Sequence, residues 1–217
     1  MENVPLPSAP KPPRIDGRRL RSERTKQLII EAFLALVRED PKVPTAIQIA
    51  ERAGYSVRSV FERFPDLNAL RAAATDYALA QAAALAPARH ADSPDRQTRL
   101  QSQVDTRAHT CERGIALWRM LMNALDESAE LKARVRRARE VTMSRLELMY
   151  KPELSVLPAE ERRDLLIALE ALTDIENWAR MREQHGLPFE EASAVWLYAI
   201  DRLLPSTPIP TSASTHD

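Results

Sequence analysis

Cysteine and glycine are scarce in this sequence of 217 residues, which contains one cysteine, Cys111, and four glycines. A single cysteine excludes an intrachain disulfide framework and a zinc site built from several cysteines. Few glycines suit a helical protein with few tight turns. Apolar runs stay well below the ~20 residues of a membrane span, and no signal-peptide pattern opens the chain. These absences predict a soluble, cytoplasmic protein with no membrane partner.

Net charge is also absent, since 31 Lys and Arg balance 31 Asp and Glu. The two parts of the chain differ, however: residues 1–71 carry 13 basic and 9 acidic side chains, and residues 72–217 carry 18 and 22. A basic N-terminal part joined to an acidic body suits a DNA-binding module attached to a body with another task. A chance imbalance is the alternative, because the difference is modest.

The two ends of the chain are predicted to be disordered tails. Five prolines fall within residues 1–17, and residues 205–217 are rich in Pro, Ser and Thr. Such segments bury too little apolar surface to fold. An arm of five arginines follows the first tail: Arg14, Arg18, Arg19, Arg21 and Arg24. It either lies along DNA phosphates or in the minor groove, or it is a solvated lead into a helix.

Apolar periodicity predicts about nine helices, and no segment shows strand alternation of useful length. One helix spans about 22–38, two short helices lie between residues 45 and 64, and a long one runs from an Asp66 cap to about Leu85. Five more are expected over 94–112, 114–125, 128–150, 158–184 and 188–204. Gly114 and Pro188 mark two of these boundaries. The predicted fold class is all-α.

The stretch from Thr45 to Leu70 has the features of a helix-turn-helix. Thr45 and Gln48 form a capping box, Gly54 supplies the turn, and Ser56 caps a second helix. The outer face of that second helix is then free to enter a DNA major groove. Six apolar anchors are predicted to hold the pair together: Ile49, Ala50, Ala53, Val60, Phe61 and Phe64.

This stretch, IAERAGYSVRSVFERFPDLNAL, resembles the DNA-binding domain of the TetR family of bacterial repressors, together with the preceding helix RTKQLIIEAFLALVRE. The resemblance covers roughly residues 22–71 and extends beyond them only as a similar all-helical architecture. The chain departs from the family pattern at three positions. Phe61 stands where the family usually has tyrosine, so a hydroxyl that reaches phosphate is missing. Leu67 replaces a usual lysine, and Ile47 replaces a residue that is often basic or polar.

Seven residues of the helix-turn-helix are candidates for DNA contact. Arg58 is the predicted base reader, since arginine pairs bidentately with guanine, although a contact to phosphate alone is the alternative. Val57 suits a thymine methyl. Phosphate contacts are expected from Thr45, Ser56, Ser59 and Arg63. Tyr55 either donates to a phosphate or covers the hinge.

The body offers candidates for an effector pocket and few for chemistry. Five residues on two helices form the pocket prediction: Trp118, Met122, Met143, Leu146 and Tyr150. They either line an adaptable pocket for a small apolar or amphipathic effector or belong to an ordinary core. In the resembled family the inducer pocket lies in this region. His109 and Cys111 are two residues apart and point to different helix faces, so neither a metal site nor a catalytic pair is expected. We predict no cofactor and no enzyme activity.

Wide apolar stripes on the last two predicted helices suggest a homodimer, which is how the resembled family assembles. The interface candidates are Leu172, Ile175, Trp178, Trp196 and Ile200. Burial of both helices within one chain is the alternative. The basic run from Lys132 to Arg139 is either a solvated face or a site for an anionic effector or partner.

Together these patterns predict a DNA-binding domain over 18–71 and a ligand-binding and dimerisation domain over 72–204. The resemblance implies a transcriptional regulator, expected to be a ligand-responsive repressor that binds a palindromic operator as a dimer. The alternative is a helical enzyme or a protein-interaction module that retains a helix-turn-helix as a scaffold.

Overall fold

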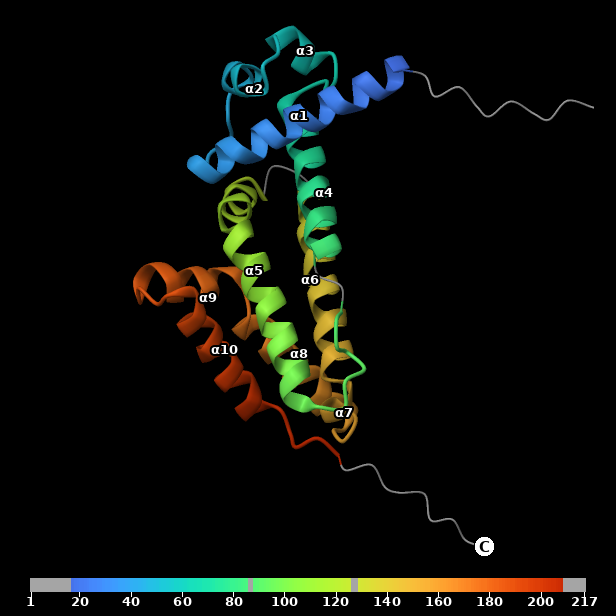
Figure 1. Ribbon diagram of the computed structural model, residues 1–217, viewed down its shortest axis with the longest axis vertical. Helices are drawn as coiled ribbons and strands as arrows, with labels where there is room; N and C mark the ends of the chain where they lie inside the picture. The colour runs from blue at the N-terminus through green and yellow to red at the C-terminus, as the bar shows by residue number, and fades with distance from the viewer. Residues whose placement is uncertain (1–16, 86–87, 126–128, 209–217) are drawn as a thin grey trace, which may run out of the picture.

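The computed structural model describes residues 17–85, 88–125 and 129–208, and in this part of the chain it contains helices and no strands. The predicted all-α class is therefore confirmed. Ten α-helices and one π-helical turn follow one another (Figure 1): α1 Gly17–Glu39, α2 Ala46–Ala53, α3 Val57–Phe61, α4 Leu67–Leu85, α5 Arg96–Asn123, α6 Ala129–Met149, α7 Lys151–Leu154, α8 Ala159–Leu172, α9 Ile175–Ala179, η2 Arg180–Gln184 and α10 Phe189–Leu203.

Local signals place α2 and α3 where the sequence predicts them. The Thr45 side chain accepts from the backbone N–H of Gln48, and the Gln48 side chain accepts from the backbone of Thr45, which completes the capping box. Gly54 adopts φ 72°, the left-handed conformation that glycine reaches without a Cβ clash. Ser56 then accepts from the backbone N–H of Ser59 and starts α3.

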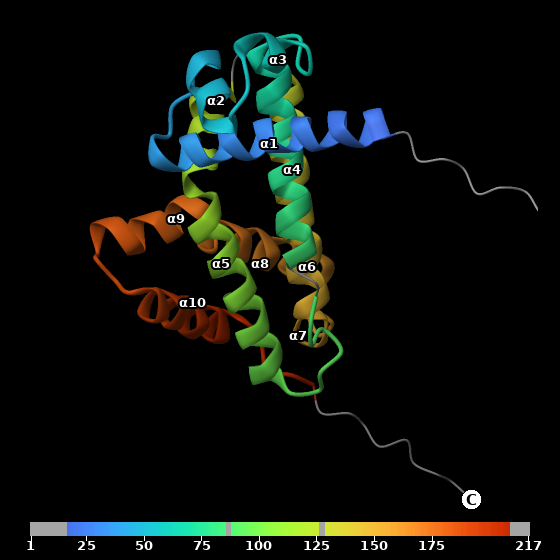
Figure 2. The same cartoon turned by 45° about the horizontal axis from the view of Figure 1, so that its top comes forward.

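We call helices α1, α2 and α3 the head, and helices α5 to α10 the body; α4 runs from one to the other (Figures 1 and 2). The core of the head is not closed by its own helices. Buried residues of α1 to α4, among them Phe33, Ile49 and Leu70, pack in one cluster with residues from the end of α5 and the start of α6. Those body residues are Met120, Leu121, Ala124 and Leu131. The head is therefore seated on the body through a shared apolar core.

Helix α5 is the central helix of the body, since it contacts α6, α9 and α10 as well as α1. The predicted break at Gly114 is wrong, because α5 is continuous from Arg96 to Asn123. A Cβ on Gly114 would lie 3.1 Å from Ile175 Cδ1, so this glycine serves a close helix approach and does not end a helix. The predicted helix over 158–184 is also wrong. Asp174 caps a new helix by accepting from the N–H of Glu176, which separates α8 from α9.

A polar network joins the start of α5 to α7, to α10 and to the residues that follow α10. The Arg99 guanidinium donates to the Glu153 carboxylate, and both side chains are 1% exposed. Arg96 donates to Asp201 Oδ1 at 2.9 Å and to the Pro205 carbonyl at 2.5 Å. Thr207 donates to Glu153 as well. The start of the predicted loose C-terminal tail is thus bound to the body, and residues 209–217 lie outside the described residues.

The N-terminal tail prediction concerns residues 1–17, of which only Gly17 is described, and it starts α1. Helix α1 therefore begins about five residues before its predicted start. The predicted arm from Arg18 to Arg24 belongs to this helix, whereas Arg14 lies outside the described residues. A short helix, α7, occupies residues 151–154, where a loop was expected.

Candidate nucleic-acid interface

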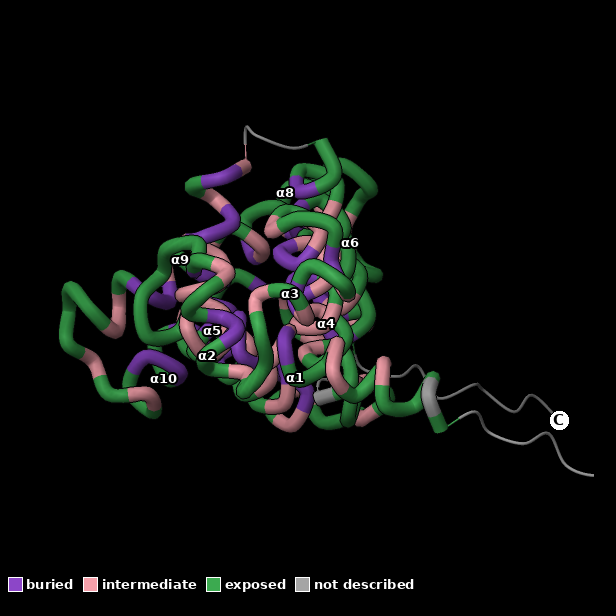
Figure 3. The backbone as a smooth tube through the Cα atoms, turned by 90° about the horizontal axis from the view of Figure 1, so that it is seen from above, coloured by how far each residue is buried: buried purple, intermediate pink, exposed green. Residues whose placement is uncertain are grey.

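Helices α2 and α3 lie at one end of the molecule, beyond α1 and away from the body (Figure 1). Seen from that end, the head faces the viewer and carries exposed residues along α1 to α3 (Figure 3). Of the seven predicted contacts, four are exposed and three are half-buried. The exposed residues are Thr45, Tyr55, Ser56 and Arg58; the half-buried ones are Val57, Ser59 and Arg63. None of the seven is buried, and their contact with DNA stays a prediction.

Arg58 is the most exposed of the basic side chains on α3, with 88% of its side chain accessible. Its Nε lies 3.0 Å from Glu62 Oε1, one helical turn away. Arg63 also approaches Glu62, at 3.6 Å, although its side chain is only 26% exposed. A carboxylate therefore stands between two arginines on the outer face of the reading helix. The sequence shows the i, i+4 spacing of Arg58 and Glu62 that produces this ion pair, but the pair is not among the predictions from the sequence.

Several of the predicted phosphate contacts already have intramolecular partners. Ser56 Oγ and Ser59 Oγ lie 3.0 Å apart, and Thr45 Oγ1 donates to Gln48 Oε1 at 2.9 Å. The Tyr55 hydroxyl accepts from Thr25 Oγ1 at 3.5 Å, which ties the hinge to α1. Of the two roles predicted for Tyr55, covering the hinge agrees with this contact. Hydroxyl groups can still donate to a phosphate, because each carries one donor and two acceptor sites.

Phe61 is not the buried anchor that apolar periodicity predicts. Its residue exposure is 45%, whereas Val60 and Phe64 are 1% and 6% exposed. The cause is helix geometry: α3 turns Val60 toward the core, and Phe61 lies about 100° away from Val60 around the helix axis. Ile47 on α2 is even more exposed, at 61%. Two large apolar side chains therefore stand on the surface of the helix-turn-helix.

The five effector-pocket candidates pack in or against two different clusters. Leu146 and Tyr150 are buried in the body core, and Trp118 and Met143 pack against that core. Met122 packs against the other cluster, which includes the head. The buried Tyr150 hydroxyl has no hydrogen-bond partner among the described residues, and burial raises its pKa. This burial favours the alternative of ordinary core packing, and an effector pocket formed by these residues stays a prediction.

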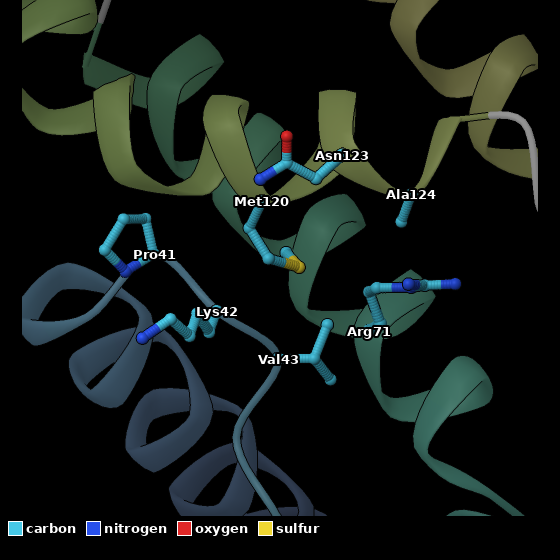
Figure 4. Close-up of a pocket in the computed structure, with 7 residues that line it drawn as sticks. All are labelled: Pro41, Lys42, Val43, Arg71, Met120, Asn123 and Ala124. Atoms are coloured by element: carbon cyan, nitrogen blue, oxygen red, sulfur yellow. The ribbon is translucent and has the colours of Figure 1, made fainter.

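Two cavities lie elsewhere. A polar groove of about 520 Å³ runs along the start of α5 and is lined by residues such as His90, Thr98 and Asp105. A smaller hollow of about 250 Å³ lies where the α1–α2 loop meets the end of α5 (Figure 4). Its lining combines apolar and basic residues: Pro41, Lys42, Val43, Arg71, Met120, Asn123 and Ala124. Neither cavity includes any of the five predicted pocket residues.

The predicted dimer residues are mostly internal. Ile175, Trp178, Trp196 and Ile200 are between 0% and 8% exposed within the single chain, and Leu172 is half-buried. Trp178 and Trp196 contact each other with ring centroids 4.8 Å apart. Burial of these four side chains within one chain favours the alternative to a dimer interface at their positions, and an interface role for Leu172 stays a prediction. The same two helices instead expose other apolar side chains: Ile167 on α8, and Val195, Tyr198 and Leu203 on α10.

His109 and Cys111 pack against neighbouring parts of the body. The His109 ring packs on Phe189 at 4.7 Å, and Cys111 is fully buried. Burial raises the pKa of the Cys111 thiol to about 11, so the thiolate that could act as a nucleophile or ligand is suppressed at neutral pH. Among the described residues, no cluster of three or more His, Cys, Asp or Glu could hold a metal ion. The same residues contain no helix that is both long and apolar enough to cross a bilayer.

Several solved structures share this arrangement of helices. A TetR-family transcriptional regulator from Streptomyces coelicolor matches with a TM-score of 0.67 at 17% identity, over 83% of this chain and 80% of that chain. One from a Rhodococcus species gives 0.66 at 18%, over 83% and 98%. The multidrug-binding protein EbrR, complexed with imidazole, gives 0.57 at 17%, over 88% and 93%. No family model and no curated protein matches the sequence.

The described residues thus form an all-α fold with an exposed helix-turn-helix at its N-terminal end. In particular, the chain has the TetR fold, with an N-terminal helix-turn-helix and a C-terminal helical body.

Proposed function

We propose that this protein is a one-component transcriptional regulator that binds a palindromic DNA operator as a homodimer and acts as a repressor in the cytoplasm. The observation that carries the proposal is α3, a capped helix whose inner side is buried in the head and whose outer side presents Arg58 to solvent. A recognition helix must offer such a free face to the edges of the bases. The DNA-binding domain would span residues 18–71 and the ligand-binding and dimerisation domain residues 72–204.

The body supports the regulatory half of the proposal through its contact with the head. The hollow of about 250 Å³ touches both the α1–α2 loop and the end of α5. Figure 4 shows Val43 from the loop and Met120 from α5 on opposite sides of this hollow. A small apolar or amphipathic effector bound here would contact both parts at once. Such a ligand changes DNA affinity only if it binds the two arrangements of head and body unequally.

No described feature favours an enzyme, and we propose that the chain has no catalytic activity. The buried Cys111 thiol and the packed His109 ring leave no activated nucleophile at either position. A protein-interaction module that keeps the helix-turn-helix as a scaffold remains the alternative, and DNA binding separates the two.

The test is selection of duplexes from a random pool by the purified protein, followed by titration at several salt concentrations. We expect recovered duplexes to share a two-fold related motif and the affinity to fall with salt, because phosphate contacts release counterions. Arg58→Ala should abolish the enrichment. Arg136→Ala is the matched control, since Arg136 is a 73% exposed arginine on α6 in the body. Failure of the wild-type protein to enrich any duplex would contradict the proposed function.

A further inference from the structure

Phe61 is an aromatic residue on the outer part of α3 that the fold of the head leaves uncovered. Its exposure is 45%, although it is the last residue of a short helix whose neighbours Val60 and Phe64 are buried. Single exposed apolar residues are common on protein surfaces and carry no meaning alone. Phe61 is of interest because it lies beside Arg58, the proposed reading residue.

Arg58 and Phe61 are three residues apart on the same helix. Residues at this spacing are neighbours on the helix surface, with Cβ atoms about 5–6 Å apart. The inner side of α3 is occupied by Val60, so both Arg58 and Phe61 are directed away from the core. Whatever surface meets the Arg58 guanidinium must therefore lie within reach of the Phe61 ring.

The chemistry of the ring limits what it can recognise. A phenyl group neither donates nor accepts a conventional hydrogen bond, so it cannot bind a phosphate oxygen in the way a hydroxyl can. In the major groove, the apolar feature that distinguishes one base from the others is the C5 methyl group of thymine.

We propose that Phe61 is a specificity-determining residue that packs on the methyl group of a thymine beside the base read by Arg58. The proposal rests on the proposed function, because it requires α3 to enter the major groove. It predicts that each half-site contains a thymine whose methyl group, and not only its hydrogen-bonding pattern, contributes to affinity.

The experiment uses a duplex recovered by selection and replaces thymine by uracil at one position at a time. Uracil keeps every hydrogen-bonding group and removes only the methyl. For the wild-type protein, one position in each half-site should lose about fourfold in affinity, as expected for one buried methyl group. Phe61→Ala should bind the thymine and uracil duplexes equally. Phe61→Leu, which keeps an apolar side chain, should retain part of the discrimination.

Two control variants separate this role from general effects. Val141→Ala removes part of a 58% exposed apolar side chain on α6 and should leave the thymine preference unchanged. Ile47→Ala does the same on α2, where Ile47 is 61% exposed. Because Phe61 is 45% exposed, Phe61→Ala should lower the melting temperature only slightly, and this checks that the head is intact.

The outcomes distinguish the two proposals. If no duplex is enriched by the wild-type protein, the proposed function fails and this inference fails with it. If a duplex is enriched but no thymine-to-uracil change matters, the function stands and the role of Phe61 is wrong. The role is equally wrong if the preference survives in Phe61→Ala, or if it disappears only in Ile47→Ala, since another residue would then read the methyl group.

Discussion

Arg58 has a competing partner in the free protein, and the strength of that contact decides whether it can read DNA. Its ion pair with Glu62 joins two exposed side chains on one helix. Exposed pairs of this kind contribute only about 0.3–0.5 kcal/mol to stability, because water and salt screen both charges. A bidentate contact to guanine discriminates by about 1–3 kcal/mol. The guanidinium can therefore leave Glu62 when a guanine is offered.

The first prediction separates base reading from phosphate contact at Arg58 on α3 and at Arg63, two residues after its end. Arg58→Ala should cost about 1–3 kcal/mol on a selected operator and much less on a scrambled duplex. Arg63→Ala should weaken binding to both duplexes alike and reduce the salt slope by about one. Arg63 lies closer to the core, with its Nε buried and 26% of its side chain exposed, so it suits a positioning contact.

The measurement is a titration of both variants on operator and scrambled duplexes over a range of salt concentrations. Variant Arg136→Ala in the body serves as the control for loss of one positive charge. If Arg58→Ala weakens both duplexes equally, Arg58 is a phosphate contact and the assignment of the reading residue is wrong.

A second prediction at the residue scale concerns the buried pair of Arg99 and Glu153. Each side chain is 1% exposed, so removing one charge leaves the other desolvated without its counter-charge. Glu153→Gln should therefore destabilise the protein by about 3–5 kcal/mol. The double replacement Arg99→Met with Glu153→Leu should recover much of that loss, because it removes both desolvated charges.

Urea unfolding followed by tryptophan fluorescence measures these differences as midpoint shifts at constant slope. Glu147→Gln, at an exposed position on α6, is the control and should change stability by less than about 0.5 kcal/mol. A change of that small size in Glu153→Gln would show that the pair does not hold α5 and α7 together.

At the scale of elements, α5 is fixed to the C-terminal helices by Glu112. The Trp178 indole donates to Glu112 Oε2 at 2.6 Å, and Arg182 donates to both carboxylate oxygens at 3.0–3.3 Å. The Arg182 guanidinium, and after it the Trp178 N–H, hold the pKa of Glu112 below its ordinary value of 4.5. One carboxylate thus joins α5, α9 and η2.

The third prediction follows from this lowered pKa. A carboxyl group that is more acidic in the folded state stabilises the fold above its unfolded pKa, and the contribution is lost as pH falls through the folded value. Glu112→Ala should destabilise the protein by about 1–3 kcal/mol at neutral pH, since it leaves the buried Trp178 donor unsatisfied. The difference from wild type should shrink as the pH is lowered below 4.5.

Thermal unfolding of the wild type and Glu112→Ala across this pH range tests the prediction, with Glu147→Ala as the exposed control. A difference that stays constant with pH would mean that the negative charge of Glu112 contributes nothing, and that its role is packing alone.

The elements also show which features of the fold sequence patterns can predict and which they cannot. The helix-turn-helix could be predicted in detail because its signals are local: the cap at Thr45, the turn at Gly54 and the cap at Ser56 act within a few residues. Gly114 was misread because its reason is a tertiary contact with Ile175, 61 positions along the chain. Trp178 and Trp196 show a similar limit, since an apolar stripe does not reveal whether its own chain or a second one covers it.

The same limit applies to the candidate site. Periodicity grouped Phe61 with Val60 and Phe64 as apolar anchors, whereas exposure depends on how many turns α3 completes and on where α1 and α4 cover it. The pocket candidates show a related limit of sequence patterns. Trp118 and Met122 lie four residues apart on α5, yet they pack against different cores, because α5 is long enough to belong to both.

At the scale of the whole molecule, the shared apolar core couples the position of the body helices to the packing of the head. Met120 is 1% exposed, packs in the cluster that includes Phe33 and Leu70, and also lines the hollow at the junction. A shift of the end of α5 must therefore move side chains inside the core of the head. This route needs no flexible linker, since the packing of interiors transmits displacement.

The last prediction concerns assembly and operator spacing. The exposed apolar side chains of α8 and α10 are the surface on which a second copy can pack: Ile167, Val195, Tyr198 and Leu203. Light scattering should give about twice the mass of one chain for the wild-type protein. Val195→Glu combined with Tyr198→Glu should give monomers, because it buries two unpaired charges in the interface. Val141→Glu, at a 58% exposed site on α6, should remain dimeric.

Binding to duplexes with different half-site spacing is a second test of the same dimer. Two heads related by a two-fold axis meet the same face of the duplex only when half-sites lie about one helical turn, or 10–10.5 base pairs, or a multiple of that, apart. Inserting half a turn between the half-sites should therefore weaken wild-type binding sharply. It should leave the Val195→Glu, Tyr198→Glu monomer unaffected, since that variant binds each half-site separately. A wild-type protein that scatters as a monomer, or tolerates the half-turn insertion, would contradict dimeric recognition through α8 and α10.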